Sequence, residues 1–263
     1  MKVFFFDIDG TLIDSMNGLR AIPGTVIAQL QRLHDAGHKL VICSGRPYAM
    51  IDADLRLPLF DAYVMCNGAH VEADGTTLHT DLMDSQLARN YVDLFEQLGM
   101  EYMLQTAHHI YLDRSYELIR HFFSEFGQPD IFTFDFDKDE VLGRTIKLEA
   151  HTTSSNYELV RETVAGRAGF TAHLDNDGAH NAFEIYSPTI SKAVGIQTVL
   201  EHYGASVEES YAFGDGVNDV EMIRYAGTGV AMGNACKELK EAADEVCGSV
   251  MEDGLARYLA TIR

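Results

Sequence analysis

Short apolar runs alternate with amphipathic helical patterns along the first part of the chain. The opening run covers residues 3–6 and ends directly in Asp7. Apolar side chains then recur at helical spacing over 27–33 until Gly37, and the apolar run KLVIC follows at 39–43. Runs that are apolar on both faces are typical of strands in a parallel sheet with helices on both sides.

The same pattern predicts further elements before residue 80. We expect a helix at about 48–57, a strand at 63–66 and a hairpin over 70–79 that turns at Asp74 and Gly75.

The order of elements changes in the middle of the chain. It becomes α-β-β-α-β-α-β-β, with the helices expected near 87–98, 115–127 and 157–165 and the strands near 101–105, 109–113, 144–151, 170–174 and 182–187. Adjacent strands without intervening helices are typical of an antiparallel α+β unit. From Thr189 the α/β alternation resumes and continues to the final helix at 254–262. The pattern therefore predicts an α/β fold, with a doubly wound parallel sheet core at 1–82 and 188–263 and an inserted α+β domain at 83–187.

Composition and charge narrow the class of partner. The 263 residues are 46% hydrophobic, and 40 acidic residues against 20 basic ones give a formal net charge of -20. This excess of acid argues against binding to nucleic acid or to anionic membranes, both of which attract basic surfaces.

The chain offers no apolar stretch of about 18 residues, as a membrane span would need, and Asp7 interrupts the apolar run at the start of the sequence. Four cysteines without CxxC spacing are typical of a reduced compartment. We expect a cytoplasmic protein with no obligate protein partner.

Small polar or acidic residues stand where the predicted strands end. Asp7 and Asp9 follow the first strand, and Ser44, Asn67 and Asp215 follow three others. Ligands of an open parallel sheet bind beyond the carboxyl ends of its strands. Carboxylates brought together there need a cation, and this oxygen-rich set suits Mg²⁺.

Each motif alone also has a structural interpretation. DIDGT is compatible with a turn after a strand, and Ser44-Gly45 with a helix cap. An isolated Lys192 is compatible with a solvated helix position, and Asn67-Gly68 with a turn. The acidic run at 135–140 lacks the glycine and the glutamate of a calcium loop and is better explained as a solvated charge run.

Taken together, the motifs resemble those of the haloacid dehalogenase-like phosphatases. They are Asp7-Ile8-Asp9-Gly10-Thr11, Ser44-Gly45-Arg46, Lys192 and GDGVND at 214–219. The insertion resembles the large cap of the Cof-type subgroup, whose members are mostly sugar-phosphate and related small-phosphate phosphatases. The resemblance implies a Rossmann-like core, Mg²⁺ dependence and a phospho-aspartyl intermediate. The chain departs from the subgroup at Thr189 and Ala193, where glycines are usual.

The resemblance also implies a role for each acidic residue. Asp7 would attack phosphorus, and Asp9 would act as general acid and then base. In the family the metal is held by the nucleophile and by the backbone carbonyl of the residue at Asp9, with Asp215 completing the protein's contacts. Asp219 is expected to belong to the metal site as an orienting acid that acts through a metal-bound water.

The remaining motif residues are expected to bind phosphate or substrate, and Lys192 and Ser44 are expected to take part in catalysis as well. Phosphoryl transfer requires donors and cations aimed at the equatorial oxygens. These would be the Ser44 hydroxyl, the Gly45 amide, Lys192 and Asn218, with the loop amides of Ile8, Gly10 and Thr11 forming an anion nest and Asn67 facing the substrate.

The sequence thus predicts a Mg²⁺-dependent phosphatase of small phosphorylated metabolites, most of all sugar phosphates. The alternatives are a phosphomutase with the same nucleophile and a phosphate-binding regulator without turnover. The retention of both Asp7 and Asp9 argues against the regulator, because a receiver-like module needs no general acid.

Overall fold

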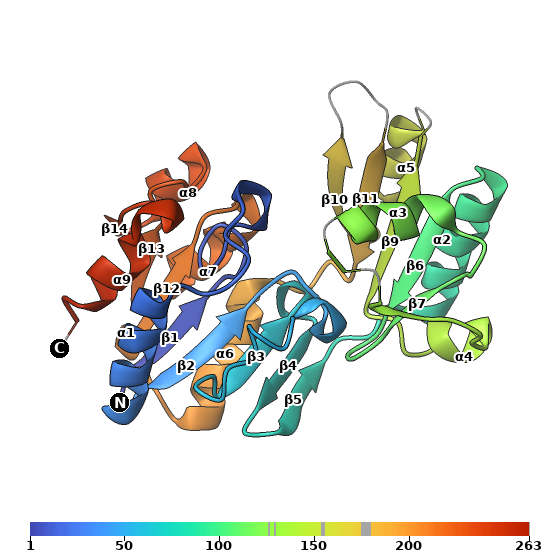
Figure 1. The fold of residues 1–263 in the computed structure, drawn as a ribbon. Coiled ribbons are helices and arrows are strands. Elements are labelled where there is room, and N and C mark those ends of the chain that lie inside the picture. The colour runs from blue at the N-terminus through green and yellow to red at the C-terminus, as the bar shows by residue number, and fades with distance from the viewer. Residues whose placement is uncertain (126, 129, 154–155, 175–179, 263) are drawn as a thin grey trace. The chain divides into compact units, whose positions relative to one another are not determined.

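The computed structural model of the chain describes residues 1–125, 127–128, 130–153, 156–174 and 180–262. It divides into two compact units, one formed by Met1–Arg46, Ile51–His79 and Ser191–Arg263 and the other by Pro47–Met50 and Thr80–Ile190. The predicted α/β class with a parallel core sheet is confirmed (Figure 1). Apart from the short segment 47–50, the chain passes from the first unit to the second at 79/80 and returns at 190/191. The sequence pattern predicts these boundaries at 82/83 and 187/188.

The first unit is built on a sheet that places β1 (Val3–Phe6) at its centre. Among the described residues the strand order is β14-β13-β12-β1-β2-β3-β4-β5. The strands β2 (Lys39–Cys43), β3 (Ala62–Met65), β12 (Ser210–Gly214), β13 (Thr228–Ala231) and β14 (Glu245–Val246) run parallel to β1, whereas β4 (His70–Ala73) is antiparallel to β3 and β5 (Thr76–Thr80) lies at the edge. All four side chains of β1 are fully buried, as an apolar central strand requires.

The connections of this sheet run in two directions from β1. The helix α1 (Gly24–Asp35) leads from β1 to β2, and α7 (Val220–Tyr225) leads from β12 to β13 on the other side of β1. Because parallel crossovers are right-handed, these two helices cover opposite faces of the sheet. The strand order therefore reverses between β1 and β12, which is the place where ligands bind in such sheets. The remaining helices of this unit are α6 (Lys192–Tyr203), α8 (Lys237–Ala242) and α9 (Gly254–Leu259).

The helix expected at 48–57 is wrong. Only Tyr48–Met50 forms a helical turn, and it is of the 3-10 type. The amides of Leu55 and Arg56 both donate to the carbonyl of Asp52, in a turn that does not continue the one at 48–50. Pro58 disfavours a helical conformation for the residue before it.

The second unit contains a largely antiparallel sheet. Its order is β10-β11-β9-β6-β7-β8 in the described residues. The strands are β6 (Glu101–Gln105), β7 (Ile110–Leu112), β8 (Phe132–Thr133), β9 (Lys147–Thr152), β10 (Gly169–Leu174) and β11 (Asn181–Tyr186), and the helices are α2 (Ser85–Gln97), α3 (Glu117–Glu125), α4 (Lys138–Leu142) and α5 (Tyr157–Val164). The predicted order lacked the short β8 and α4. The acidic run at 135–140 starts α4, which Asp137 caps by accepting from the amides of Asp139 and Glu140.

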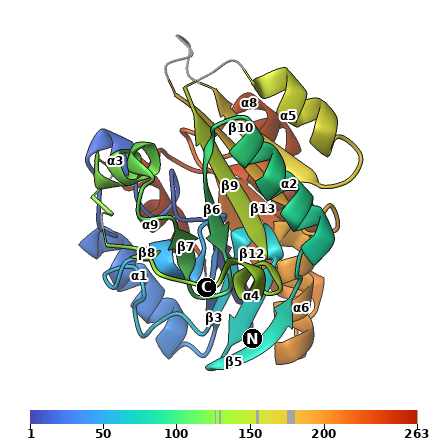
Figure 2. The same cartoon turned by 90° about the vertical axis from the view of Figure 1, so that its right-hand side faces the viewer.

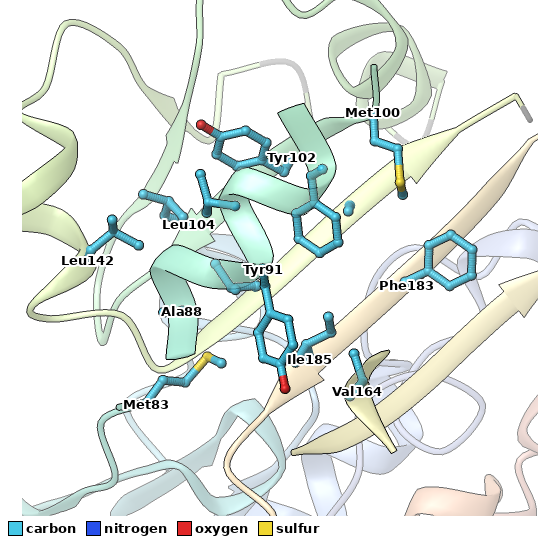
Figure 3. Close-up of a cluster of buried hydrophobic side chains, with 14 of the residues drawn as sticks. Met83, Ala88, Tyr91, Met100, Tyr102, Leu104, Leu142, Val164, Phe183 and Ile185 are labelled. Carbon is cyan, nitrogen blue, oxygen red and sulfur yellow. The ribbon is translucent and has the colours of Figure 1, made fainter. Parts of the chain in front are cut away.

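The two faces of this sheet differ in what they bury. On one face, α2 and α5 pack against the strands, with Tyr91 and Val164 in one apolar cluster with Phe183 and Ile185 (Figures 2 and 3). On the other face, α3 contributes Ile119 and Phe123 to a smaller apolar cluster.

In the described part of the chain, no helix is long and apolar enough to cross a membrane.

Candidate active site

A buried lysine joins two of the predicted acidic residues. Lys192 is the first residue of α6, and its Nζ lies 2.5 Å from Asp7 Oδ1 and 2.6 Å from Asp219 Oδ1. Asp7 follows β1, where its amide donates to the carbonyl of Phe213 on β12 at 3.0 Å. These side chains have almost no contact with solvent. Buried charges of this kind persist only when they are paired, so the three groups hold one another in place.

The pKa values of these groups reflect burial and mutual charge. Burial raises the pKa of Asp7 well above its ordinary value, although Lys192 opposes the change. Burial and the charge of Asp219 raise the pKa of Asp215 to about 7. Burial opposes the charged form of Lys192, but the carboxylates of Asp219 and Asp7 raise its pKa above the usual value. Lys192 therefore stays protonated, whereas the acids bear unfavourable negative charge.

Asp219 closes the loop that follows β12. Its Oδ2 accepts from the amides of Asp215 at 3.0 Å and Gly216 at 2.9 Å, while Oδ1 accepts from Lys192. Both carboxylate oxygens thus already have donors. This arrangement favours an orienting role for Asp219 over direct metal ligation.

The acidic group has the composition of a divalent cation site. Asp7, Asp215 and Asp219 each offer an oxygen, and these atoms lie within 4.8 Å of one another. Among the described residues, no side chain or amide donates to the carboxylate of Asp215. A single lysine does not neutralise three carboxylates, and an all-oxygen set suits Mg²⁺. Asp7 and Asp215 therefore fit a magnesium ion, with Asp219 beside them as the residue that orients the loop.

Gly10 allows the loop after β1 to lie against Asp215. With a φ of +83°, a Cβ at this position would lie 2.1 Å from Asp215 Oδ2. The Gly10 amide donates to the Ile13 carbonyl at 2.7 Å. Since the peptide bond is trans, the carbonyl of Asp9 points away from Ile13. That carbonyl remains available as a metal ligand.

The general-acid candidate, Asp9, is held by an arginine. Arg46 Nε and Nη2 donate to Asp9 Oδ2 and Oδ1 at 2.7 and 2.6 Å. The sequence identified Arg46 only as the third residue of the SGR motif and assigned it no role. Its position directly after Ser44-Gly45 was the available signal.

The candidate phosphate-binding residues meet at the ends of β2 and β3. Asn218 Nδ2 donates to Asn67 Oδ1 at 3.2 Å, and a Cβ on Gly45 would lie 3.1 Å from that same oxygen. Ser44 is buried, and its hydroxyl accepts from the amide of Arg46. Within the described residues, Ser44 makes no hydrogen bond to Asp7 or Lys192.

An unusual turn places Asn67 there. Cys66, Asn67 and Gly68 all have positive φ, at 50°, 57° and 101°. A Cβ on Gly68 would lie 2.2 Å from the carbonyl of Ser191, so only glycine allows the turn to pack against the start of α6. Backbone strain of this kind often occurs at functional sites.

The other members of the predicted anion nest are deeply buried. Ile8 contributes its side chain to the core, so a role in binding would have to come from its main chain. Thr11 is also buried, and its hydroxyl has no hydrogen-bond partner among the described residues. Both belong to the loop that Gly10 turns.

Asn234 is a site residue that sequence reasoning missed. Its Nδ2 donates to the carbonyl of Gly10 at 2.8 Å, and its Oδ1 accepts from the amide of Val250 at 2.9 Å. It therefore fixes the loop of Asp9 from the opposite end of the chain. An asparagine after a glycine predicts only a turn, so the sequence carried little signal for this contact.

The chain is similar to known proteins over nearly its whole length. A family model described as haloacid dehalogenase-like hydrolase matches residues 4–259. The chain is 30% identical over 271 residues to the putative phosphatase YkrA of Bacillus subtilis, with 97% of this chain and 95% of the relative covered. It is 28% identical over 260 residues to the 5-amino-6-(5-phospho-D-ribitylamino)uracil phosphatase YitU of the same organism, with 96% and 94% covered.

A solved structure is similar over nearly the whole chain. It is that of BT4131, described as a HAD subclass IIB sugar phosphatase, with a TM-score of 0.83, 26% identity and coverage of 99% of this chain and 98% of the other.

Proposed function

Because the chain belongs to the haloacid dehalogenase-like hydrolases and is a phosphatase of the Cof-type group, we propose that it hydrolyses small phosphomonoesters with Mg²⁺ through a phospho-aspartyl intermediate on Asp7. Sugar phosphates are the preferred class in this proposal. The observation that carries it is the position of Lys192, buried between Asp7 and Asp219 beside the carboxylate of Asp215, which accepts no hydrogen bond from the described residues.

In the first step, a carboxylate oxygen of Asp7 forms a bond to phosphorus while the bond from phosphorus to the leaving oxygen breaks. Lys192 fixes the other side of the carboxylate and adds positive charge next to the phosphoryl group. Splitting hydrolysis into two displacements replaces one difficult step by two easier ones.

Asp9 moves the protons in this proposal. It gives a proton to the leaving alcohol and then takes one from the water that attacks the acyl phosphate, which restores the free carboxylate of Asp7. The side chain of Asp9 is 52% exposed, so it has access to both the alcohol and the water.

Mg²⁺ would be held by the carboxylates of Asp7 and Asp215 and by the carbonyl of Asp9, with Asp219 orienting the loop. When bound, the ion offsets the negative charge that the phosphoryl group brings to these acids. The Ser44 hydroxyl, the Gly45 amide and Asn218 supply donors for the phosphate oxygens.

The inserted unit, 83–187, is assigned the role of a cap that selects the leaving group. None of the proposed catalytic or metal-binding residues lies within it. The relatives support a range of leaving groups, since one is named for a ribitylamino uracil phosphate and another, YbhA of Escherichia coli, for pyridoxal phosphate. The proposal places the enzyme in the cytoplasm, without a nucleic acid, membrane or obligate protein partner.

The test is phosphate release with and without Mg²⁺ across phosphosugars, nucleotides and cofactor phosphates. The proposal expects Mg²⁺-dependent release with highest kcat/KM for phosphosugars. A phosphomutase would instead convert a hexose phosphate to its isomer without release, and a binding protein would do neither.

A further inference from the structure

The second unit carries a polar network on one face of its sheet. The strand register pairs Gln105 with Lys147 and Glu149 with Glu184, so these four side chains point to the same side of the sheet. The other face carries the larger apolar cluster, which α2 and α5 cover, whereas α3 packs a smaller apolar cluster on the same face as the four polar side chains. A polar set on three adjacent strands is thus confined to one side.

The members of this network fix one another. Glu149 Oε2 accepts from Gln105 Nε2 at 2.9 Å, and Glu149 Oε1 lies 2.9 Å from His151 Nε2. Lys147 Nζ lies 2.7 Å from Glu184 Oε1. Gln105, Lys147 and Glu149 are all more than nine-tenths buried. A buried network of charges stabilises a fold less than well-packed apolar residues of similar volume, so stability alone does not account for it.

One acceptor in this network has no donor. The Oε1 atom of Gln105 is buried and has no hydrogen-bond partner among the described residues. The amide orientation follows from the carboxylate of Glu149, which needs the NH₂ group of Gln105 as its donor. A buried acceptor left without a donor is costly, so the position favours a ligand that brings a hydroxyl or N–H group.

We propose that this network, centred on Gln105, Lys147 and Glu149, recognises hydroxyl groups on the leaving group, which makes polyol and sugar phosphates the substrate class. A hydroxyl donates to Gln105 Oε1 and accepts from Lys147, two roles that an alkyl or aryl leaving group does not fill. The inference rests on the proposed function, in which the inserted unit selects the leaving group.

The test compares two substrates with the same carbon chain, glucitol 6-phosphate and n-hexyl phosphate, in the full-length enzyme with Mg²⁺. The wild type is expected to prefer glucitol 6-phosphate in kcat/KM. Gln105→Met keeps the length of the side chain but removes the acceptor, so it should lower kcat/KM for glucitol 6-phosphate by about tenfold or more. Its kcat/KM for n-hexyl phosphate should stay within about threefold of the wild type.

Two further variants control for folding. Thr152→Val changes a buried polar residue on the opposite face of β9 and should leave the ratio between the substrates unchanged. If Gln105→Met does not fold, the double variant Lys147→Met with Glu184→Met removes both charges together, so neither is left unpaired. It is expected to lose the same preference.

The outcomes separate this inference from the proposed function. Equal losses on both substrates, or no loss on either in a folded variant, would show that the network is structural and overturn the inference. Absence of Asp7-dependent turnover of any phosphate ester would instead overturn the proposed function, and this inference with it.

Discussion

Arg46 holds both carboxylate oxygens of Asp9, with Nε 2.7 Å from Oδ2 and Nη2 2.6 Å from Oδ1. The arginine side chain is 17% exposed and that of Asp9 is 52% exposed. A bidentate pair fixes the plane of the carboxylate, and exposure to water keeps the cost of opening one bond small. Arg46 therefore orients the proposed acid and can still release it toward a leaving group.

The first prediction concerns this pair. Arg46→Ala should slow single-turnover formation of the acyl phosphate by about tenfold for alkyl phosphates, because a misoriented acid loses part of its ~10²–10⁴-fold contribution. Arg46→Lys should recover little, since a lysine does not make two parallel bonds. In an Asp9→Asn background, Arg46→Ala should have no further effect on the ratio of alkyl to aryl rates. If Arg46→Ala also changes this ratio about tenfold in the Asp9→Asn background, Arg46 does not act through Asp9.

The second prediction concerns Asp9 itself. Asp9→Asn should reduce acyl-phosphate formation by roughly 10²–10⁴-fold for an alkyl phosphate and much less for p-nitrophenyl phosphate. An alkoxide needs a proton to leave, whereas p-nitrophenolate leaves readily without one. The measurement is single-turnover quenched flow with both substrates. Equal losses would remove Asp9 from the acid role.

The third prediction uses two glycines with similar backbone angles. Gly10 has φ +83° and a Cβ there would lie 2.1 Å from Asp215 Oδ2, whereas Gly18 has φ +87° and open space around it. Gly10→Ala should raise the Mg²⁺ concentration needed for half-maximal activity at least tenfold, because Asp215 or the loop must move. Gly18→Ala carries the same backbone strain and should leave this concentration unchanged. The account of the metal site is wrong if both variants behave alike.

The fourth prediction concerns pH and the metal. Burial raises the pKa of Asp7 well above its usual value and that of Asp215 to about 7. Without metal, the folded chain therefore binds more protons than the unfolded chain at pH values between the ordinary and the raised pKa of these acids. Its free energy of unfolding falls as the pH rises through about 7.

Mg²⁺ competes with these protons, so its affinity should weaken as the pH falls below about 7. The increase in Tm on adding Mg²⁺, followed by calorimetry, should accordingly be larger at pH about 8 than at pH about 6. Asp215→Asn is the control and should remove most of this pH dependence. An increment in Tm that does not change with pH would contradict the raised carboxylate pKa values.

Much of the candidate site could be predicted from the sequence because its acidic residues stand at the ends of strands. Once β1, β2, β3 and β12 are recognised as parallel strands, their carboxyl ends must meet at one edge of the sheet. The contacts of Arg46 with Asp9 and of Asn234 with Gly10 could not be predicted in this way. They join loops 37 and 224 residues apart, and no periodicity connects such positions.

Short elements were missed for a related reason. β8 has 2 residues and α4 has 5, too few to show a hydrophobic period.

Thr189, which stands where the Cof-type subgroup usually has glycine, makes contacts of its own in the structure. Its hydroxyl lies 2.8 Å from that of Ser187 and donates to Asp81 at 2.9 Å, contacts that a glycine would not make.

The most direct test of the account is to trap the phosphoryl group on Asp7. The Asp9→Asn variant, which should dephosphorylate slowly, is mixed with p-nitrophenyl phosphate and Mg²⁺, quenched in acid, digested and analysed by peptide mass spectrometry. The account predicts one phosphoryl group on the peptide that contains Asp7, chelator-sensitive formation of this adduct, and no adduct when Asp7→Asn is combined with the variant. Release of p-nitrophenol by a folded enzyme with no phosphopeptide at any quench time, or a phosphoryl group on another residue, would contradict it.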